Sequence, residues 1–433
     1  MALPEIISLQ PLTRLPRVEV VVPGSKSITN RALILAVLRE GVTSLRGALW
    51  SEDTQVMVLC LRTLGFEIAV ESDLAEGSNR TLIVHGRGGR IPAGGSVESP
   101  LELFVGNAGT AARFLTALVC LGDGCYRLAG IDRMHDRPQS GLIHALRRLG
   151  YEVKSENDRL PVVVEGAGLK QALCEVDSLE SSQFASALLL ASEAGGWKVR
   201  LKGQSADQSP YVKMTVELMA AMKQGGRKFQ IEPDASSGSY FWALNALGLP
   251  LEGENGVADD RLNVKVQNWP ESGWQVDAEF PKFLNYDGEL SRERDLGDSI
   301  MTAIVLAALR NTPRRFVDLG RLRVQECERV VALRTELGKC GAHVIEEGDT
   351  LVVEPGEHRS ASVETYNDHR MAMCFALIGL CRSGIEIRDP GCVRKTFPSF
   401  FQKLAAPPPC GLGATIWDAQ SGRRLQNEGL AAD

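Results

Sequence analysis

The sequence lacks the features that mark several classes of protein. None of its ten cysteines forms a C-x-x-C pair, and there is no uninterrupted run of about 18 apolar residues. The first residues, MALPEIISLQPLTRLPR, have no cationic start followed by an apolar stretch and a small-residue cleavage site. We therefore expect a cytoplasmic protein that neither crosses a membrane nor is exported. We interpret the cysteines as reduced core residues, with disulfide or zinc use as the less favoured alternative.

An excess of positive charge is also absent. The formal net charge is −6 over 433 residues, which gives no general electrostatic reason to bind nucleic acid or an anionic membrane. Any site for an anion must therefore be local. The length allows two or three domains, and a hydrophobic content of 44% suits an ordinary globular protein.

The chain does contain an internal repeat. Six Ala/Leu/Met-rich helix candidates each follow a short polar or glycine-containing signal. They are SKSITNRALILAVLREG from Ser25, AGTAARFLTALVCLG from Ala108, SSQFASALLLAS from Ser181, SSGSYFWALNALG from Ser236, DSIMTAIVLAAL from Asp298 and DHRMAMCFALIGL from Asp368. Their starts lie roughly 55 to 83 residues apart, which suits one βαβ-containing unit each. Several units add an amphipathic helix that ends at a glycine, whereas residues 250–297 show no clear second helix.

Six units divide naturally into three and three, with residues 225–235 as a crossing point. The near-continuous apolarity of the six helices predicts that they are buried inside each domain, with the amphipathic helices outside. The fold class is therefore α/β, built from α+β repeats in two similar domains. The last residues, 406–433, lose all periodicity and predict a flexible tail.

Polar residues gather where the six helices begin. If the helices lie parallel within each domain, their N-terminal ends share one face, and each end carries unpaired N–H groups and about half a positive charge. Serine and aspartate there are most often ordinary caps, but Arg31 and Arg113 enter helices with little solvent-facing surface. We interpret the set as a cationic cleft for a small polyanion. It comprises Lys26, Ser27, Arg31, Gly109, Thr110, Arg113, Ser181, Ser182, Gln183, Asp298, His369 and Arg370.

Seven motifs together resemble one enzyme family. They are PGSKSITNRALIL (23–35), LFVGNAGTAARFL (103–115), RMHDRP (133–138), SSQF (181–184), DASSGSYF (234–241), YNDHRMAMCFALIGL (366–380) and KTFPSFF (395–401). In this order, over roughly residues 5–404, the chain is similar to the 5-enolpyruvylshikimate-3-phosphate (EPSP) synthase family. The resemblance implies two domains joined by two crossovers, each an inside-out α/β barrel of three βαβαββ units. The first domain would be residues 1–20 plus 233–405, and the second 21–232.

The resemblance also implies a reaction. Members of the family transfer the enolpyruvyl group of phosphoenolpyruvate to the 5-hydroxyl of shikimate 3-phosphate and release phosphate, in the shikimate pathway that leads to chorismate and the aromatic amino acids. The reaction is an addition and elimination through a tetrahedral intermediate, without metal, other cofactor or covalent enzyme adduct. We expect a monomer whose domains close on shikimate 3-phosphate, and glyphosate is the family's inhibitor.

Residue by residue, the resemblance implies these roles. The catalytic residues are Lys26, Asp298, Glu326 and His369, where Asp298 takes the hydroxyl proton and Glu326 protonates the methylene carbon. Shikimate 3-phosphate is bound by Lys26, Ser27, Arg31, Ser181, Ser182, Gln183, Tyr211 and Asp298. Phosphoenolpyruvate is bound by Lys26, Gly109, Arg113, Arg133, Gln183, Arg329, Arg370 and Lys395. From the sequence alone, Glu326 is better explained by an ion pair with Arg329 at i+3.

Four positions depart from the family's pattern. Gln208 replaces a serine, Arg321 a common amide residue and Gln325 a lysine, all on the shikimate-phosphate side, and Phe114 replaces a proline that bears on glyphosate. Three other functions therefore stay open. One is UDP-N-acetylglucosamine enolpyruvyl transfer, which typically pairs lysine with asparagine where this chain has Lys26 and Ser27. The others are transfer to another phosphorylated acceptor and a catalytically silent anion-binding protein.

Overall fold

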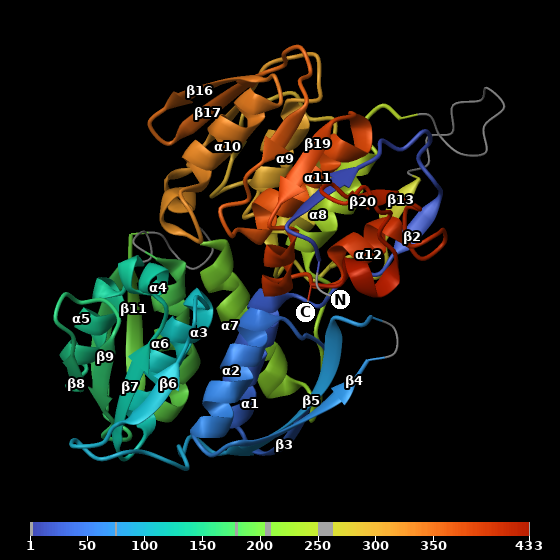
Figure 1. Cartoon of the computed structure of the whole chain (residues 1–433). Helices are drawn as coiled ribbons and strands as arrows, with labels where there is room; N and C mark the ends of the chain where they lie inside the picture. Colours follow the sequence, from blue (N-terminus) through green and yellow to red (C-terminus); the bar gives the residue numbers. More distant parts are fainter. Residues whose placement is uncertain (1–2, 74–75, 178–180, 204–208, 250–262, 433) are drawn as a thin grey trace. The chain divides into compact units, whose positions relative to one another are not determined.

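The computed structural model describes residues 3–73, 76–177, 181–203, 209–249 and 263–432 (Figure 1). The chain forms two compact units. Unit 1 comprises Met1–Pro23, Pro233–Glu271 and Val276–Asp433, and unit 2 comprises Gly24–Glu232 and Ser272–Gln275. Each unit has a hydrophobic core of its own. The fold is mixed α/β, as the sequence predicts.

Unit 2 contains three sheets among its described residues. The first has the order β12-β3-β5-β4 and the second β6-β7-β9-β8, while β10 and β11 form a parallel pair. The strands are β3 (Glu40–Leu49), β4 (Glu67–Ser72), β5 (Asn79–Arg87), β6 (Leu101–Phe104), β7 (Cys125–Ala129), β8 (Glu152–Lys154), β9 (Val162–Glu165), β10 (Ala172–Asp177), β11 (Trp197–Lys202) and β12 (Lys228–Gln230).

Unit 1 likewise shows three sheets in its described part. Their orders are β14-β15-β17-β16, β18-β19-β1-β20 and the parallel pair β13-β2. The strands are β1 (Ile6–Leu9), β2 (Val18–Val20), β13 (Val264–Val266), β14 (Leu290–Ser291), β15 (Arg314–Val317), β16 (His343–Glu347), β17 (Thr350–Glu354), β18 (Ala361–Val363), β19 (Ile385–Arg388) and β20 (Ile416–Asp418).

The four larger sheets share one pairing pattern. In each, the first two strands are parallel and the two remaining pairs are antiparallel. Each unit therefore has two sheets of this pattern and one parallel pair. This recurrence is the structural counterpart of the repeat in the sequence.

All six predicted apolar helices are present. They are α1 (Lys26–Leu38), α3 (Gly109–Leu118) and α6 (Ser182–Gly195) in unit 2, and α8 (Ala235–Leu244), α9 (Ile300–Ala307) and α11 (His369–Cys381) in unit 1. Every residue of α8 is buried, and so is α11 from His369 to Leu380. In each of the other four helices more than half of the residues are buried, as their largely apolar composition predicts.

The remaining helices connect the strands and cover the sheets. Those of unit 2 are α2 (Glu52–Thr63), α4 (Asp132–Asp136), α5 (Ser140–Arg148), α7 (Pro210–Gln224) and the 3₁₀ turn η1 (Val119–Leu121). Those of unit 1 are α10 (Arg329–Lys339), α12 (Phe400–Ala405) and the 3₁₀ segments η3 (Val276–Phe283), η4 (Gly320–Val324), η5 (Pro390–Lys395) and η6 (Asn427–Leu430). None of the helices in the described part of the chain is long and apolar enough to span a bilayer.

The C-terminal segment corrects the sequence prediction of a flexible tail at 406–433. Strand β20 pairs with β1, with Ile416 opposite Leu9. Leu412, Leu425 and Leu430 are buried in the core of unit 1. The segment shows no helical or strand periodicity because its apolar residues are spaced irregularly, but these residues are buried in the core of unit 1.

A second departure concerns residues 272–275, which the sequence prediction placed in the first domain with 233–405. They pack with unit 2 instead. Trp274 stacks on Phe229 with ring centroids 6.0 Å apart, and Gln275 donates from its side-chain nitrogen to Glu232 over 3.2 Å. Residues 21–23, predicted in the second domain, lie with unit 1.

Candidate active site

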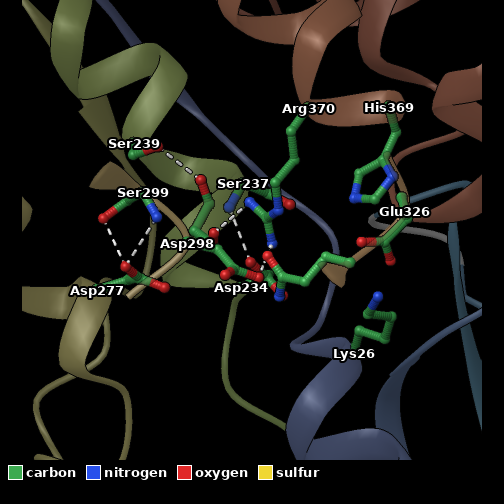
Figure 2. Close-up of polar contacts among 12 residues, drawn as sticks. Lys26, Asp234, Ser237, Ser239, Asp277, Asp298, Ser299, Glu326, His369 and Arg370 are labelled. Carbon is green, nitrogen blue, oxygen red and sulfur yellow. Dashed lines mark hydrogen bonds and ion pairs between the residues drawn. The ribbon is translucent and has the colours of Figure 1, made fainter. Parts of the chain in front are cut away.

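Three helix N-termini of unit 1 meet around Arg370. This residue is the second of α11, and its guanidinium donates to Ser236 Oγ in the first turn of α8 over 2.5 Å. The same guanidinium lies 3.2 Å from Asp298 Oδ2, just before α9 (Figure 2). The sequence predicted these helix starts, and the structure brings them together within one unit.

Asp298 is held between two arginines. Arg292 donates to Asp298 Oδ1 over 2.9 Å, and Arg370 approaches Oδ2. The Asp298 side chain is 18% exposed. Burial alone would raise the pKa of its carboxyl, but Arg370 and Arg292 hold that pKa well below its usual range. The carboxylate is therefore ionised and fixed in place. Nothing in the sequence motifs pointed to Arg292.

Glu326 occupies a second buried ion-pair site. Arg329 Nη2 lies 2.9 Å from Glu326 Oε2, and Lys395 Nζ lies 3.5 Å from Oε1. The Glu326 side chain is only 8% exposed. The ion pair with Arg329 that the sequence suggested is present, but it is not a surface pair between neighbouring turns. Arg329 of α10 and Lys395 of η5 both pair with this carboxylate, which is nearly inaccessible to solvent.

Asp368 links the two carboxylate sites, although the sequence analysis gave it no role beyond a helix start. Its side chain caps α11 by accepting from the backbone N–H of Arg370. It also accepts from Arg329 Nε over 2.7 Å and from Nη2 over 3.2 Å. This bidentate pair is fully buried, so Asp368 fixes the guanidinium that Glu326 contacts. His369 is buried beside it, with Nδ1 3.7 Å from Asp368 Oδ1.

Gln325 also contacts Arg329. Its side-chain oxygen accepts from Arg329 Nη1 over 2.6 Å. A lysine, common here in the family, has no acceptor and could not make this bond. Arg321 lies in the preceding segment η4. Gln208, the third departure from the family's pattern on the acceptor side, lies outside the described residues.

In unit 2, Lys26 and Arg31 lie on α1. Lys26 pairs with Asp53 at 2.9 Å. Arg31 is buried and donates to Thr215 Oγ1, Ser186 Oγ and the carbonyl oxygens of Ser27 and Tyr211. Burial lowers the pKa of Arg31 to about 10, which leaves it a cation at neutral pH. Its guanidinium also lies 5.3 Å from the centre of the Phe114 ring.

The start of α3 is crowded by arginines. Arg113 is buried and donates to the carbonyl oxygens of Gly109 and Pro138. A Cβ at Gly109 would lie 2.5 Å from Arg137 Nη2 and 2.7 Å from Arg113 Nη1, so glycine lets both guanidinium groups approach the backbone. Arg137, which the sequence analysis did not single out, donates to the carbonyl oxygen of Asn107. Arg133 is half-buried on α4.

The remaining predicted residues of unit 2 lie at the start of α6 and α7. Ser181 is the N-cap of α6, and its side chain accepts from the backbone N–H of Gln183 over 3.3 Å. Ser182 and Gln183 are half-buried in the first turn of the same helix. Tyr211 is half-buried at the start of α7. Among the described residues, no group of three or more His, Cys, Asp and Glu side chains is arranged to hold a metal ion.

The sequence model of EPSP synthase, 3-phosphoshikimate 1-carboxyvinyltransferase, matches residues 13–404. The chain belongs to the EPSP synthase family. Two curated relatives named 3-phosphoshikimate 1-carboxyvinyltransferase support this. The one from Opitutus terrae is 38% identical over 94% of this chain and 98% of its own length. The one from Pseudomonas savastanoi pv. phaseolicola is 39% identical over 89% of this chain and 93% of its own.

Solved structures agree on the fold. An EPSP synthase from Acinetobacter baumannii has a TM-score of 0.67 at 20% identity and covers 95% of this chain and 100% of its own. The enolpyruvyl transferase NikO from Streptomyces tendae has a TM-score of 0.68 at 15% identity, with 98% and 100% covered. The sequence model and the curated relatives confirm the EPSP synthase family and its activity, which the motifs predicted. The chain is an enzyme of the shikimate pathway, a 3-phosphoshikimate 1-carboxyvinyltransferase.

Proposed function

We propose that this chain transfers the enolpyruvyl group of phosphoenolpyruvate to the 5-hydroxyl of shikimate 3-phosphate with two carboxylates of unit 1 as its proton-transfer groups. Asp298 takes the proton of the attacking hydroxyl, and Glu326 delivers a proton to the methylene carbon. The observation that carries this proposal is the pairing of both carboxylates with cations from α10, α11 and η5. Carboxylates can perform both proton transfers when neighbouring charges tune them.

The donor is held by the cations that surround these carboxylates. Arg329, Arg370 and Lys395 of unit 1 bind the phosphate and carboxylate of phosphoenolpyruvate, together with Lys26, Gly109, Arg113, Arg133 and Gln183 of unit 2. Guanidinium groups bind such oxyanions in a bidentate manner and stabilise charge that develops during the reaction. The unit 1 cations pair with Asp298 and Glu326, so donor binding must weaken these pairs. A carboxylate that loses its cation partner becomes a stronger base.

The acceptor is held by unit 2. Ser27, Arg31, Ser181, Ser182, Gln183 and Tyr211 bind shikimate 3-phosphate, with Lys26 and Asp298 near its reacting hydroxyl. Arg31 suits a phosphate because its partners among the described residues are hydroxyl and carbonyl oxygens rather than carboxylates. Within the described part of the chain, no carboxylate among these partners neutralises its charge. His369 is assigned to the reaction centre beside Glu326, as the family's pattern implies.

The finer architecture is part of the same proposal. Each unit is an inside-out α/β barrel of three repeats, and the two units close on shikimate 3-phosphate. The enzyme acts as a monomer in the cytoplasm and uses no metal or organic cofactor. Small-angle scattering that shows no compaction with shikimate 3-phosphate would contradict closure.

The proposed roles are tested with Glu326→Gln, which keeps the shape of the side chain and removes its proton-transfer capacity. We expect kcat to fall by about 10²–10⁴-fold, while phosphoenolpyruvate binding stays detectable. Glu347→Gln is the control, since Glu347 pairs with Arg315 on an exposed surface of the same unit. Wild-type turnover by Glu326→Gln would refute the assignment. Phosphate release with shikimate 3-phosphate, compared with UDP-N-acetylglucosamine, tests the acceptor.

A further inference from the structure

Asp277 is a buried carboxylate next to the proposed base, and the motifs of the family do not include it. It is the second residue of η3, and its side chain is almost fully buried. Its Oδ1 accepts two hydrogen bonds from Ser299, one from the backbone N–H over 3.0 Å and one from the hydroxyl over 2.5 Å (Figure 2). Ser299 directly follows Asp298 in the chain.

Ser299 is held from outside its own helix. As the N-cap of α9 it would ordinarily bond an N–H group of the first turn, but its side chain makes no such bond. Its hydroxyl and its N–H both point to Asp277 instead. One turn later, Thr302 Oγ1 lies 2.8 Å from Ser239 Oγ of α8, which ties the helix to its neighbour. The start of α9 is thus fixed by contacts from η3 and α8.

Burying the Asp277 carboxylate at this position costs folding free energy. Burial first, and then the charge of Asp298, raise the pKa of Asp277, against the opposing effects of its Ser299 bonds and the charge of Arg370. A buried carboxylate near another carboxylate is unfavourable unless its hydrogen bonds are needed. The two bonds to Ser299 offset part of this cost, and they act on the peptide that carries Asp298.

We propose that Asp277 is a positioning residue for the transfer reaction: by fixing the backbone and hydroxyl of Ser299, it sets the direction in which the Asp298 carboxylate points. The proposal rests on the proposed role of Asp298 as the base. Arg292 and Arg370 hold the two oxygens of the Asp298 carboxylate. With the main chain and both oxygens fixed, the base is held close to the geometry that proton transfer from a hydroxyl requires.

Three variants test this proposal. Asp277→Ala removes both acceptor bonds, Ser299→Ala removes the hydroxyl bond alone, and Asp277→Asn retains an oxygen that can accept both. We expect Asp277→Ala to lower kcat at least tenfold, with KM for both substrates within about threefold of wild type. Ser299→Ala should lower kcat less, and Asp277→Asn should restore most of it. Glu279→Ala on the same segment is the control, because the Glu279 side chain lies at the surface, where it pairs with Lys282.

The outcomes separate this inference from the proposed function. A wild-type kcat for Asp277→Ala would overturn it, and so would equal losses of kcat in Asp277→Ala and Asp277→Asn, because the second variant keeps the geometry. If Asp277→Ala does not fold, the kcat of Ser299→Ala is the test instead. A kcat of Ser299→Ala equal to that of the wild type overturns the proposal. Asp298→Asn tests the base itself. Retained turnover in Asp298→Asn refutes the proposed function, whereas an inactive Asp298→Asn beside a fully active Asp277→Ala refutes only the positioning role.

Discussion

Replacing the proposed base should tighten the binding of the donor. The Arg370 guanidinium is shared by Asp298, Ser236 and Tyr240. Phosphoenolpyruvate must compete with the Asp298 carboxylate for this guanidinium. Asp298→Asn keeps the size of the side chain and removes the negative charge. The variant should therefore lose turnover and yet bind the anionic donor more strongly than the wild type does.

The expected size of this effect follows from the contacts of Asp298. Its carboxylate has one charge-assisted contact with Arg370, at 3.2 Å, and one with Arg292, at 2.9 Å. Only the contact with Arg370 competes with the proposed donor site. A hydrogen bond to a charged group contributes about 1.5–3 kcal/mol. Removing the contact between Asp298 and Arg370, with which the donor competes, should lower the Kd for phosphoenolpyruvate by about 10- to 150-fold.

Calorimetric titration with phosphoenolpyruvate checks this prediction. Acceptor is omitted, so that neither the wild type nor the variant turns over. Asp287→Asn is the matched control, because it removes an exposed carboxylate that pairs with Arg314 elsewhere in unit 1. The control should bind the donor as the wild type does. An equal or weaker affinity in Asp298→Asn would show that donor and base do not share Arg370.

Two further predictions concern stability. Ile416→Ala should lower the free energy of unfolding, measured with denaturant, by about 2–5 kcal/mol, because Ile416 is fully buried in the core of unit 1. The control Gln420→Ala, in the exposed turn nearby, should change it by no more than about 0.5 kcal/mol. Equally small effects of both substitutions would support the prediction of a flexible tail. Asp277→Asn should gain thermal stability relative to wild type as pH rises from about 4 to 7. The pKa of Asp277 is raised in the folded state. The stability that the protonated Asp277 gives the wild type is therefore fully present below its unfolded pKa of about 3.9 and is lost as pH rises through the folded pKa. A difference in melting temperature between variant and wild type that does not change with pH would contradict this.

The parts of the fold that the sequence predicted are those with strong local signals. The apolar helices were predictable because an uninterrupted run such as that of α11 can only be buried. The C-terminal segment was wrongly predicted because β20 is three residues long and its buried neighbours follow no period. The side chains of residues 272–275 likewise form no pattern, and only the stacking of Trp274 on Phe229 shows where they pack.

The site was predictable to the extent that its residues lie in motifs. Arg370 and Asp368 share the NDHRMA motif, yet Asp368 looked like an ordinary cap because its bonds to Arg329 join segments 39 residues apart. Arg292 and Asp277 lie in no motif; Arg292 bonds to Asp298 from six residues earlier in the chain, and Asp277 bonds to Ser299 from 22 residues earlier. Contacts of this kind are decided by packing, and no local spacing in a single sequence records them.

The carboxylates of unit 1 offset the mutual repulsion of its cations. A site for a polyanion needs several positive groups, and at helix N-termini the helix dipoles add to their positive charge. Without negative partners these groups would repel one another. Asp368, Glu326 and Asp298 offset that repulsion by pairing with Arg329, Lys395 and Arg370. Asp368 is fully buried and stays with Arg329 as a structural partner. In the proposed mechanism, the incoming anion replaces Glu326 and Asp298 as partners of the cations, so the two carboxylates that offset the repulsion are also the two that the ligand releases for proton transfer.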